Sequence, residues 1–141
     1  MSIRKAEAVW EGTLLEGAGT MNSGSGAFQV KFSHATRFKD EPGSNPEELV
    51  GAAHAGCFSM FLSSLLTNEG YPPIRIRTIA DVHLERDDIG PKITRIELTT
   101  EAEVPGIDLA SFEDLAFKAK ERCPVSRALE GVEIHVRAIL V

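Results

Sequence analysis

The sequence predicts an α+β fold, formed as a single domain over residues 1–141 and organised around one long helix. Three observations predict this class. Short stretches of alternating apolar and polar residues, typical of half-buried strands, lie on both sides of a central segment. That segment carries no formal charge from Leu49 to Thr67. A shorter amphipathic helix pattern follows near the C-terminal end. The expected order is three strands, the long helix, two strands, a helix, a short helix and a closing strand.

Three short strands are expected first, over residues 6–12, 14–21 and 27–34. Glycine-containing breaks separate them, and such spacing predicts an antiparallel meander. Residues 35–44 then form a charged loop that carries Arg37. A loop that delivers an arginine toward a helix is a candidate functional element.

The long helix has well-marked ends. Asn45 can cap the first free amides, Pro46 suits the first helical position, and Glu48 stands where the acid of a capping box would stand. Gly70 can adopt the left-handed turn that ends a helix, and Pro72 prevents continuation. These limits give about 24 residues, or roughly 36 Å.

Although long enough to cross a membrane, this helix contains His54, several hydroxyl side chains and no flanking basic or tryptophan belt. We therefore expect no membrane partner, and we interpret a helix that is apolar on all sides as the buried centre of the fold. Small residues recur at every fourth position, which predicts a ridge for close packing against another helix. They are Gly51, Ala55, Ser59 and Ser63.

The C-terminal half begins with two β patterns, over residues 74–85 and 92–104, which predict a hairpin. Asp108 or Ser111 then caps a helix that runs to about Arg122.

Cys123 follows that helix and precedes Pro124, so it lies where the chain turns, as the cap of a short helix over residues 125–129. Residues 132–141 alternate as a closing strand.

The net charge limits the classes of molecule that the protein is expected to bind. The formal net charge of −6 argues against nucleic acid or an anionic membrane surface. Small molecules or proteins are the expected partners. The first residues lack the apolar segment of a signal peptide, so the protein is expected in the cytoplasm.

The two cysteines, Cys57 and Cys123, are not expected to form a structural disulfide in a reducing compartment. The four histidines form no close-spaced ligand set with either cysteine, so we predict no metal site. No cofactor is called for.

The residue types leave two interpretations of each thiol open. Cys57 is either a small core residue or a nucleophile that needs a neighbouring positive charge, and Arg37 is either a solvated loop residue or the source of that charge. Cys123 is either the end of an apolar stripe or an accessible resolving thiol. His54, three residues before Cys57, is either a core histidine or a base for the thiol.

Helix capping explains Glu48 but explains Glu47 less well. Glu47 precedes Cys57 by ten residues, about 15 Å along a helix. The two side chains cannot touch within one helix. If both serve one site, two such helices cross so that Glu47 of one chain reaches Cys57 of another. That arrangement predicts a homodimer.

Several motifs together resemble the OsmC/Ohr family of organic hydroperoxide reductases, over essentially the whole chain. The strongest are Thr36-Arg37-Phe38, residues 43–60 and Cys123-Pro124-Val125-Ser126, supported by residues 8–12, 80–82 and 104–108. The first motif and the start of the long helix are more similar to the osmotically inducible, OsmC-like branch than to the Ohr branch.

The resemblance implies an OsmC-like fold as an intertwined homodimer with two active sites at the subunit interface. It matches Cys57 to the peroxidatic cysteine, Cys123 to the resolving cysteine, and Arg37 and Glu47 to the pair that holds the first thiol reactive. It implies a stress-defence enzyme that reduces organic hydroperoxides, and hydrogen peroxide more weakly, to alcohols. A Cys57 sulfenic acid and a Cys57–Cys123 disulfide would form in turn, and an external dithiol, of the lipoyl type in the family, would restore both thiols.

Apolar neighbours of the thiol, Phe58, Met60 and Phe61, would favour an organic hydroperoxide, although the helical pattern alone assigns them to the core. Gly56 stands where relatives often have alanine, and is expected to loosen the helix locally. The alternative from another class is a dimeric small-molecule-binding or redox-switch protein without peroxidase turnover, in which the cysteines are packing residues or a switch.

Overall fold

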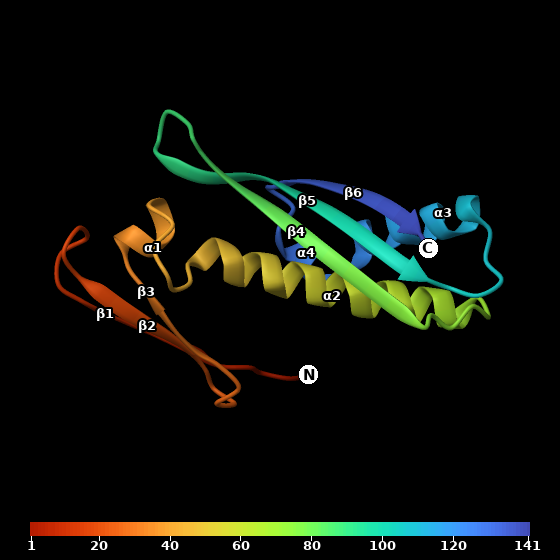
Figure 1. The fold of residues 1–141 in the computed structure, drawn as a ribbon, viewed down its shortest axis with the longest axis horizontal. Coiled ribbons are helices and arrows are strands. Elements are labelled where there is room, and N and C mark those ends of the chain that lie inside the picture. Colours follow the sequence, from red (N-terminus) through yellow and green to blue (C-terminus); the bar gives the residue numbers. More distant parts are fainter. The chain divides into compact units, whose positions relative to one another are not determined.

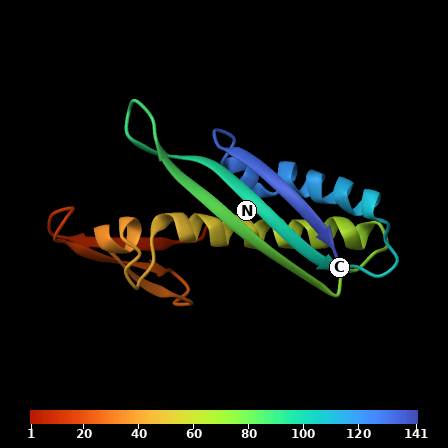
Figure 2. The ribbon, with the colours of Figure 1, turned by 45° about the horizontal axis from the view of Figure 1, so that its top comes forward.

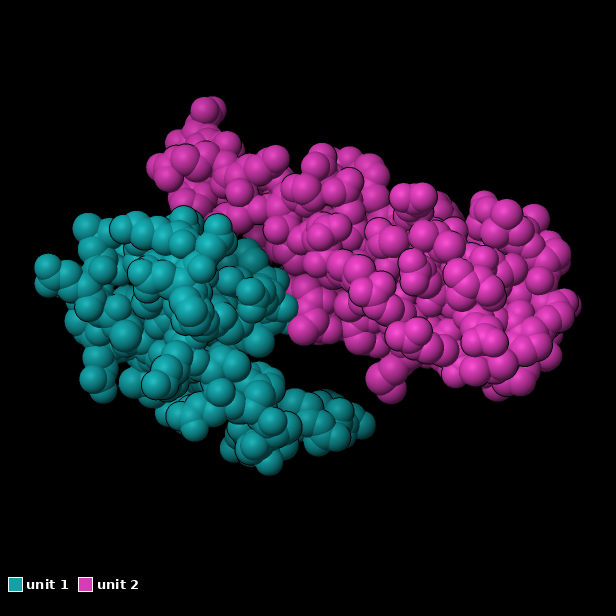
Figure 3. Space-filling model, in the orientation of Figure 1, with its two compact units in different colours: residues 1–49 teal, residues 50–141 magenta.

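The computed structural model describes residues 1–141, which divide into two compact units, residues 1–49 and 50–141 (Figures 1 and 3). The predicted order of elements is confirmed, with one short helix added. The elements are β1 (Ala6–Glu11), β2 (Ala18–Ser23), β3 (Gln29–Phe32), α1 (His34–Phe38), α2 (Pro46–Asn68), β4 (Arg75–Arg86), β5 (Pro91–Glu103), α3 (Leu109–Arg122), α4 (Pro124–Ala128) and β6 (Glu133–Leu140). Whether the chain acts as a single domain stays a prediction.

The first unit contains the predicted antiparallel meander, β1-β2-β3. Strand β2 begins at Ala18 rather than at residue 14, because Gly12 takes a φ of 96° and a turn follows, closed by the Gly17 N–H on the Thr13 carbonyl at 2.8 Å. This turn keeps Leu14 and Leu15 exposed and outside the ladder.

The predicted loop before the long helix contains α1, which the sequence interpretation missed. Ser33 caps it: its Oγ accepts the Thr36 N–H at 3.2 Å, and the Ser33 N–H donates to Thr36 Oγ1 at 2.8 Å. This is a capping box with threonine in place of the usual acid. A helix of five residues is too short to show a period, so only the cap could have revealed it.

The ends of α2 are as predicted. Asn45 Oδ1 accepts the Glu48 N–H at 2.9 Å, and Gly70 takes a φ of 87° with the Tyr71 N–H bonded to the Leu66 carbonyl at 2.8 Å. That is a Schellman ending. The predicted capping box is only half formed, because the Glu48 carboxylate accepts from Ser44 Oγ at 2.9 Å instead of from the cap backbone.

The second unit is a three-stranded sheet, β4-β5-β6, with helices against one face (Figures 1 and 2). The β4–β5 hairpin is confirmed, with an irregularity between His83 and Leu84. Strand β6 pairs parallel to β5, with Ile134 opposite Ile96, because α3 and α4 form the connection between them.

The core lies between that sheet face and the helices. Phe58 and Leu62 of α2, Leu98 of β5, and Phe112 and Ala116 of α3 are all almost completely buried. The predicted apolar stripe of α3 is confirmed, because its buried residues are those expected from the helical spacing. Each large side chain buried here contributes about 1.5–3 kcal/mol to folding.

The small-residue ridge of α2 packs closely, as predicted, but its contacts within the chain are with strand β4 rather than with another helix. A Cβ at Gly51 would lie 3.2 Å from Val82 Cγ2, and Ser59 Oγ lies 2.7 Å from Thr78 Oγ1. A sheet can approach a glycine as closely as a helix can, so the spacing alone did not decide between them.

The interpretation that α2 is buried on all sides is wrong. An uncharged stripe at helical spacing is exposed along it, and we call this the α2 stripe: Ala53, Gly56, Met60, Ser64 and Thr67. By length and composition α2 is also the one helix that could cross a membrane, a test that core helices of soluble proteins pass as well.

Candidate active site

Arg37 and Glu47 form an ion pair within the first unit. Arg37 Nη2 and Nε donate to Glu47 Oε1 at 2.6 and 3.1 Å, and Nε also lies 3.1 Å from Oε2. Glu47 is buried, whereas Arg37 stays 36% exposed, and its Nη1 makes no hydrogen bond to the protein. A guanidinium held in this way keeps a fixed orientation and a free donor edge.

Local structure fixes both partners. Arg37 lies in the single turn of α1, and Glu47 in the first turn of α2. Thr36 joins the two helix starts, because its Oγ1 donates to the Ser44 carbonyl at 2.7 Å and its carbonyl accepts from Asn45 Nδ2 at 3.3 Å.

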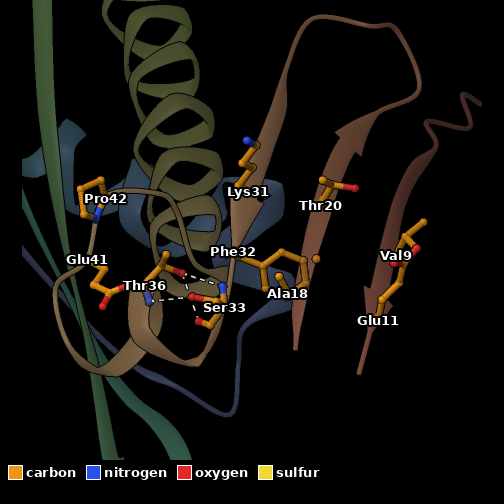
Figure 4. Close-up of a pocket in the computed structure, with 11 residues that line it drawn as sticks. Val9, Glu11, Ala18, Thr20, Lys31, Phe32, Ser33, Thr36, Glu41 and Pro42 are labelled. Carbon is orange, nitrogen blue, oxygen red and sulfur yellow. Dashed lines mark hydrogen bonds between the residues drawn. The ribbon is translucent and has the colours of Figure 1, made fainter. Parts of the chain in front are cut away.

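A cavity of about 340 Å³ adjoins this arginine within the first unit. It is lined by Trp10, Leu14, Phe32, Ser33, His34, Arg37 and Phe38. A larger cavity of about 480 Å³ lies on the neighbouring face of the meander, between β1, β2, β3 and the loop after α1 (Figure 4). Arg37 does not line the larger cavity, so the smaller, more apolar one is the candidate binding pocket.

Cys57 and Cys123 come together in the second unit, from the middle of α2 and from the junction of α3 and α4. Burial is the main cause that raises the pKa of the Cys57 thiol. The backbone N–H of Val125 acts in the opposite direction, and the Cys123 thiol raises the pKa further. Both cysteines are free thiols. Residues 50–141 alone therefore bring the two sulfurs together but do not activate the first one.

Cys123 caps α4, as predicted: its Sγ accepts the Ser126 N–H at 3.4 Å. Of the two interpretations left open for this thiol, the structure favours the end of the apolar stripe over the accessible one, because its side chain is 0% exposed. The turn at Pro124 folds inward over the core, which a sequence pattern cannot show.

His54 does not bond to Cys57. Its Nε2 lies 2.7 Å from Ser126 Oγ, which in turn lies 3.1 Å from Cys123 Sγ. His54 is completely buried, and burial lowers its pKa. The sequence interpretation missed Ser126, although its place at the third position after the Cys123 cap was a visible signal.

The predicted residues thus form two pairs, Arg37 with Glu47 and Cys57 with Cys123, one in each unit. That the two pairs build one site stays a prediction. Of the predicted apolar neighbours, Phe58 belongs to the core and Met60 is 78% exposed. No group of three histidine, cysteine or acidic side chains is placed to hold a metal ion.

That Gly56 loosens the helix locally stays a prediction. Helix α2 continues through it, and a Cβ at this position would meet nothing within 4 Å.

Together the fold and site define an α+β protein in which Cys57 of a long helix lies near a second thiol, Cys123, at the junction of α3 and α4. Residues 38–137 match the family described as OsmC-like protein. The chain is 48% identical over 129 residues to the peroxiredoxin OsmC of Escherichia coli (strain K12), which covers 91% of this chain and 90% of that protein. The chain belongs to the OsmC-like protein family.

Two further comparisons agree. The organic hydroperoxide resistance protein OhrA of Bacillus subtilis (strain 168) is 29% identical over 93 residues, 66% of this chain and 64% of that protein. The structure of an OsmC-like protein of unknown function from Vibrio cholerae O1 biovar eltor superposes with a TM-score of 0.80 at 20% identity, over 99% of this chain and 100% of that one. The predicted family and fold are confirmed, and the identities agree with the OsmC-like branch.

Proposed function

We propose that this protein is a cysteine-based thiol peroxidase that reduces organic hydroperoxides, and hydrogen peroxide more weakly, to alcohols. The observation that carries the proposal is that the Cys123 thiol and the Val125 backbone N–H lie near enough to Cys57 to affect its pKa. Two thiols held together can pass through a sulfenic acid to a disulfide. The names of the relatives, a peroxiredoxin and a hydroperoxide resistance protein, support the same chemistry and a role in stress defence.

In the proposed mechanism Arg37 supplies the positive charge that Cys57 lacks within its own unit. The Cys57 thiolate attacks the terminal oxygen of the hydroperoxide, the O–O bond breaks, and an alcohol leaves after taking up a proton. Glu47 holds the guanidinium in place through the double hydrogen bond. Cys57 becomes a sulfenic acid, Cys123 condenses with it and water leaves. An external dithiol, in our proposal of the lipoyl type, then reduces the disulfide.

The pocket beside Arg37 supports a preference for organic peroxides. Its walls include the rings of Trp10, Phe32 and Phe38, and a volume of about 340 Å³ suits an alkyl or aryl group. The peroxide oxygens would then lie near the free edge of the guanidinium.

We also propose that the protein acts as an intertwined homodimer in the cytoplasm. Residues 1–49 contain no buried apolar side chain, since all of those lie between Phe58 and Cys123. A unit of this size cannot hold its fold without covering apolar surface. Val9, Trp10 and Phe28 on the meander, together with the α2 stripe, are the surfaces that a second copy would cover.

The test is steady-state consumption of cumene hydroperoxide by the purified protein supplied with dihydrolipoamide. The unaltered protein should turn over. After peroxide treatment, mass spectrometry of the unaltered protein should show loss of two hydrogens per chain and a Cys57–Cys123 linkage. Cys57→Ser should lose all activity. Unreactive thiols in the unaltered protein would instead support a small-molecule-binding protein. Full activity in Cys57→Ser would exclude the mechanism.

A further inference from the structure

A buried chain of hydrogen-bonding groups reaches the second thiol, Cys123. His54 Nε2, Ser126 Oγ and Cys123 Sγ follow one another at 2.7 and 3.1 Å. His54 and Cys123 are 0% exposed and Ser126 is 5% exposed. The chain joins α2 to α4 across 72 residues of sequence, so it depends on the tertiary fold.

The order of donors in this chain is constrained. A neutral imidazole carries one proton, and a serine hydroxyl donates one hydrogen bond while accepting others. With the proton on Nδ1, the Ser126 hydroxyl donates to His54 Nε2 and accepts from the Cys123 thiol. With the proton on Nε2, each bond reverses, and the hydroxyl donates to the Cys123 sulfur.

The unused ring nitrogen is the second observation. His54 Nδ1 is buried and has no hydrogen-bond partner in the protein. Buried polar atoms are nearly always paired, so an unpaired one in a folded core needs an explanation. An apolar residue could pack in the same place without the free-energy cost of burying an unpaired nitrogen.

We propose that His54, acting through Ser126, takes the proton of Cys123 as the disulfide forms. This inference rests on the proposed function, because it concerns the resolving step of that reaction. Thiols react as thiolates, and Cys123 has no direct access to water through which to lose its proton. A proton chain of protein groups lets the thiol react without forming a free buried thiolate.

The step balances as follows. The Cys123 sulfur attacks the sulfur of the Cys57 sulfenic acid, the S–S bond forms and the S–O bond breaks, so the Cys123 sulfur is oxidised and the Cys57 sulfur is reduced. The Cys123 proton passes to Ser126 Oγ while the serine proton passes to His54 Nε2. Hydroxide leaves Cys57, takes a proton from solvent and becomes water. His54 keeps the proton it took from Ser126 until the disulfide is reduced, when that proton returns through Ser126 to the Cys123 sulfur. The net product of the oxidation step is one water.

The same groups act in the reverse direction when the Cys57–Cys123 disulfide is reduced. When a dithiol attacks the Cys57 sulfur of the disulfide, Cys123 leaves as a thiolate. Ser126 then donates to it from both its hydroxyl and its backbone N–H, at 3.1 and 3.4 Å. Ser126 contacts the reacting sulfur directly, whereas His54 is a positioning residue that acts through it.

The experiment separates the two oxidation steps. Reduced protein is mixed with one equivalent of cumene hydroperoxide, Cys57 sulfenic acid is trapped with dimedone, and disulfide is followed by non-reducing mass spectrometry, over a range of pH. His54→Gln keeps a hydrogen bond to Ser126 but cannot take a proton, and Ser126→Ala breaks the chain. His83→Gln, on the sheet surface beside Glu97, is the matched control.

We expect both variants to form sulfenic acid at the rate of the unaltered protein and to form disulfide about 10²-fold more slowly. Their disulfide step should also move to higher pH, because Cys123 must then lose its proton unaided. The titratable groups that bear on this step are Cys57, Cys123 and His54, and burial is the cause of the lowered His54 pKa. The His83→Gln control should match the unaltered protein.

Disulfide formation at the unaltered rate in either variant overturns the relay, and so does a slower rate with an unmoved pH profile, which indicates a packing role. If His54→Gln does not fold, Ser126→Ala decides. Absence of both sulfenic acid and disulfide in the unaltered protein after peroxide treatment is a distinct outcome, which contradicts the proposed function and the relay with it.

Discussion

For Arg37 the sequence left two interpretations open, a solvated loop residue or the positive partner of a thiolate. The structure holds it on Glu47 through two nitrogens and leaves Nη1 free, which is the geometry of an oriented donor rather than of a solvated side chain. The cation of Arg37 also lies 5.3 Å from the ring centre of Phe38, which restricts its motion further.

Replacing Arg37 by glutamine should lower kcat/KM for cumene hydroperoxide by about 10²-fold, because the developing negative charge loses its donor. The pH profile should move as well. Burial raises the pKa of Cys57, so without the guanidinium the thiolate forms only at higher pH. Rate measurements across pH test both. Arg77→Gln, which removes a surface ion pair with Glu101, is the control and should leave rate and profile unchanged. An unmoved profile in Arg37→Gln would contradict the assigned role.

At the scale of elements, the capping side chains define the helix starts more clearly than hydrophobic periodicity does. The starts of α1, α2 and α3 are each set by one side chain, Ser33, Asn45 and Asp108. Asp108 resolves the choice left open by the sequence, because it accepts from both the backbone N–H and the hydroxyl of Ser111, at 3.0 and 2.7 Å.

The Asp108 cap should make stability depend on pH. The Ser111 hydrogen bonds lower its pKa in the folded state, so its stabilising effect is complete above the unfolded pKa, about 3.9. That effect is lost as pH falls through the folded pKa. Asp108→Asn keeps a cap that does not ionise, and should therefore flatten this part of the curve of unfolding free energy against pH. Denaturant melts at acidic pH measure it, with Asp88→Asn in the β4–β5 turn for comparison. Parallel curves for Asp108→Asn and the unaltered chain would show that the cap has no ionic component.

For the whole molecule, the distribution of buried surface is the main result. The second unit has a core between its sheet and helices, whereas the first unit buries only polar side chains, Ser44 and Glu47. The α2 stripe lies open on the helix that carries Cys57. These facts support the proposed dimer independently of the family relationship.

A charge on the α2 stripe should weaken that dimer. Met60→Glu would place an unpaired carboxylate in the proposed interface, and we expect the dimer Kd to rise roughly 10²-fold. Light scattering coupled to size-exclusion chromatography gives the mass. Ile89→Glu, at the exposed tip of the β4–β5 turn, should leave the mass unchanged. A dimer of unaltered strength in Met60→Glu would exclude the stripe from the interface.

Mixed dimers test whether Glu47 of one chain serves Cys57 of the other. Glu47→Ala and Cys57→Ser chains should each be weak or inactive alone. In a mixed dimer of the proposed type both lesions fall in one site, so the other site is intact and hydroperoxide turnover returns. No recovery, despite chain exchange shown by native mass spectrometry of tagged chains, would refute a shared site.

The sequence by itself determined the order of elements, the ends of α2 and the family, because strand alternation, helix caps and the motifs around Arg37 and the two cysteines are local signals. It also predicted which four residues to examine. It missed α1, because one helical turn shows no period, and it misjudged the exposed face of α2, because apolar composition does not say what covers a helix.

Only the tertiary structure decided how those residues are used. It placed Cys123 in the core, turned the small-residue ridge of α2 toward β4, and brought Ser126 between His54 and Cys123. Each of these depends on contacts between residues far apart in the chain. Such contacts follow from how the sheet and helices pack, and no spacing within a single segment records them.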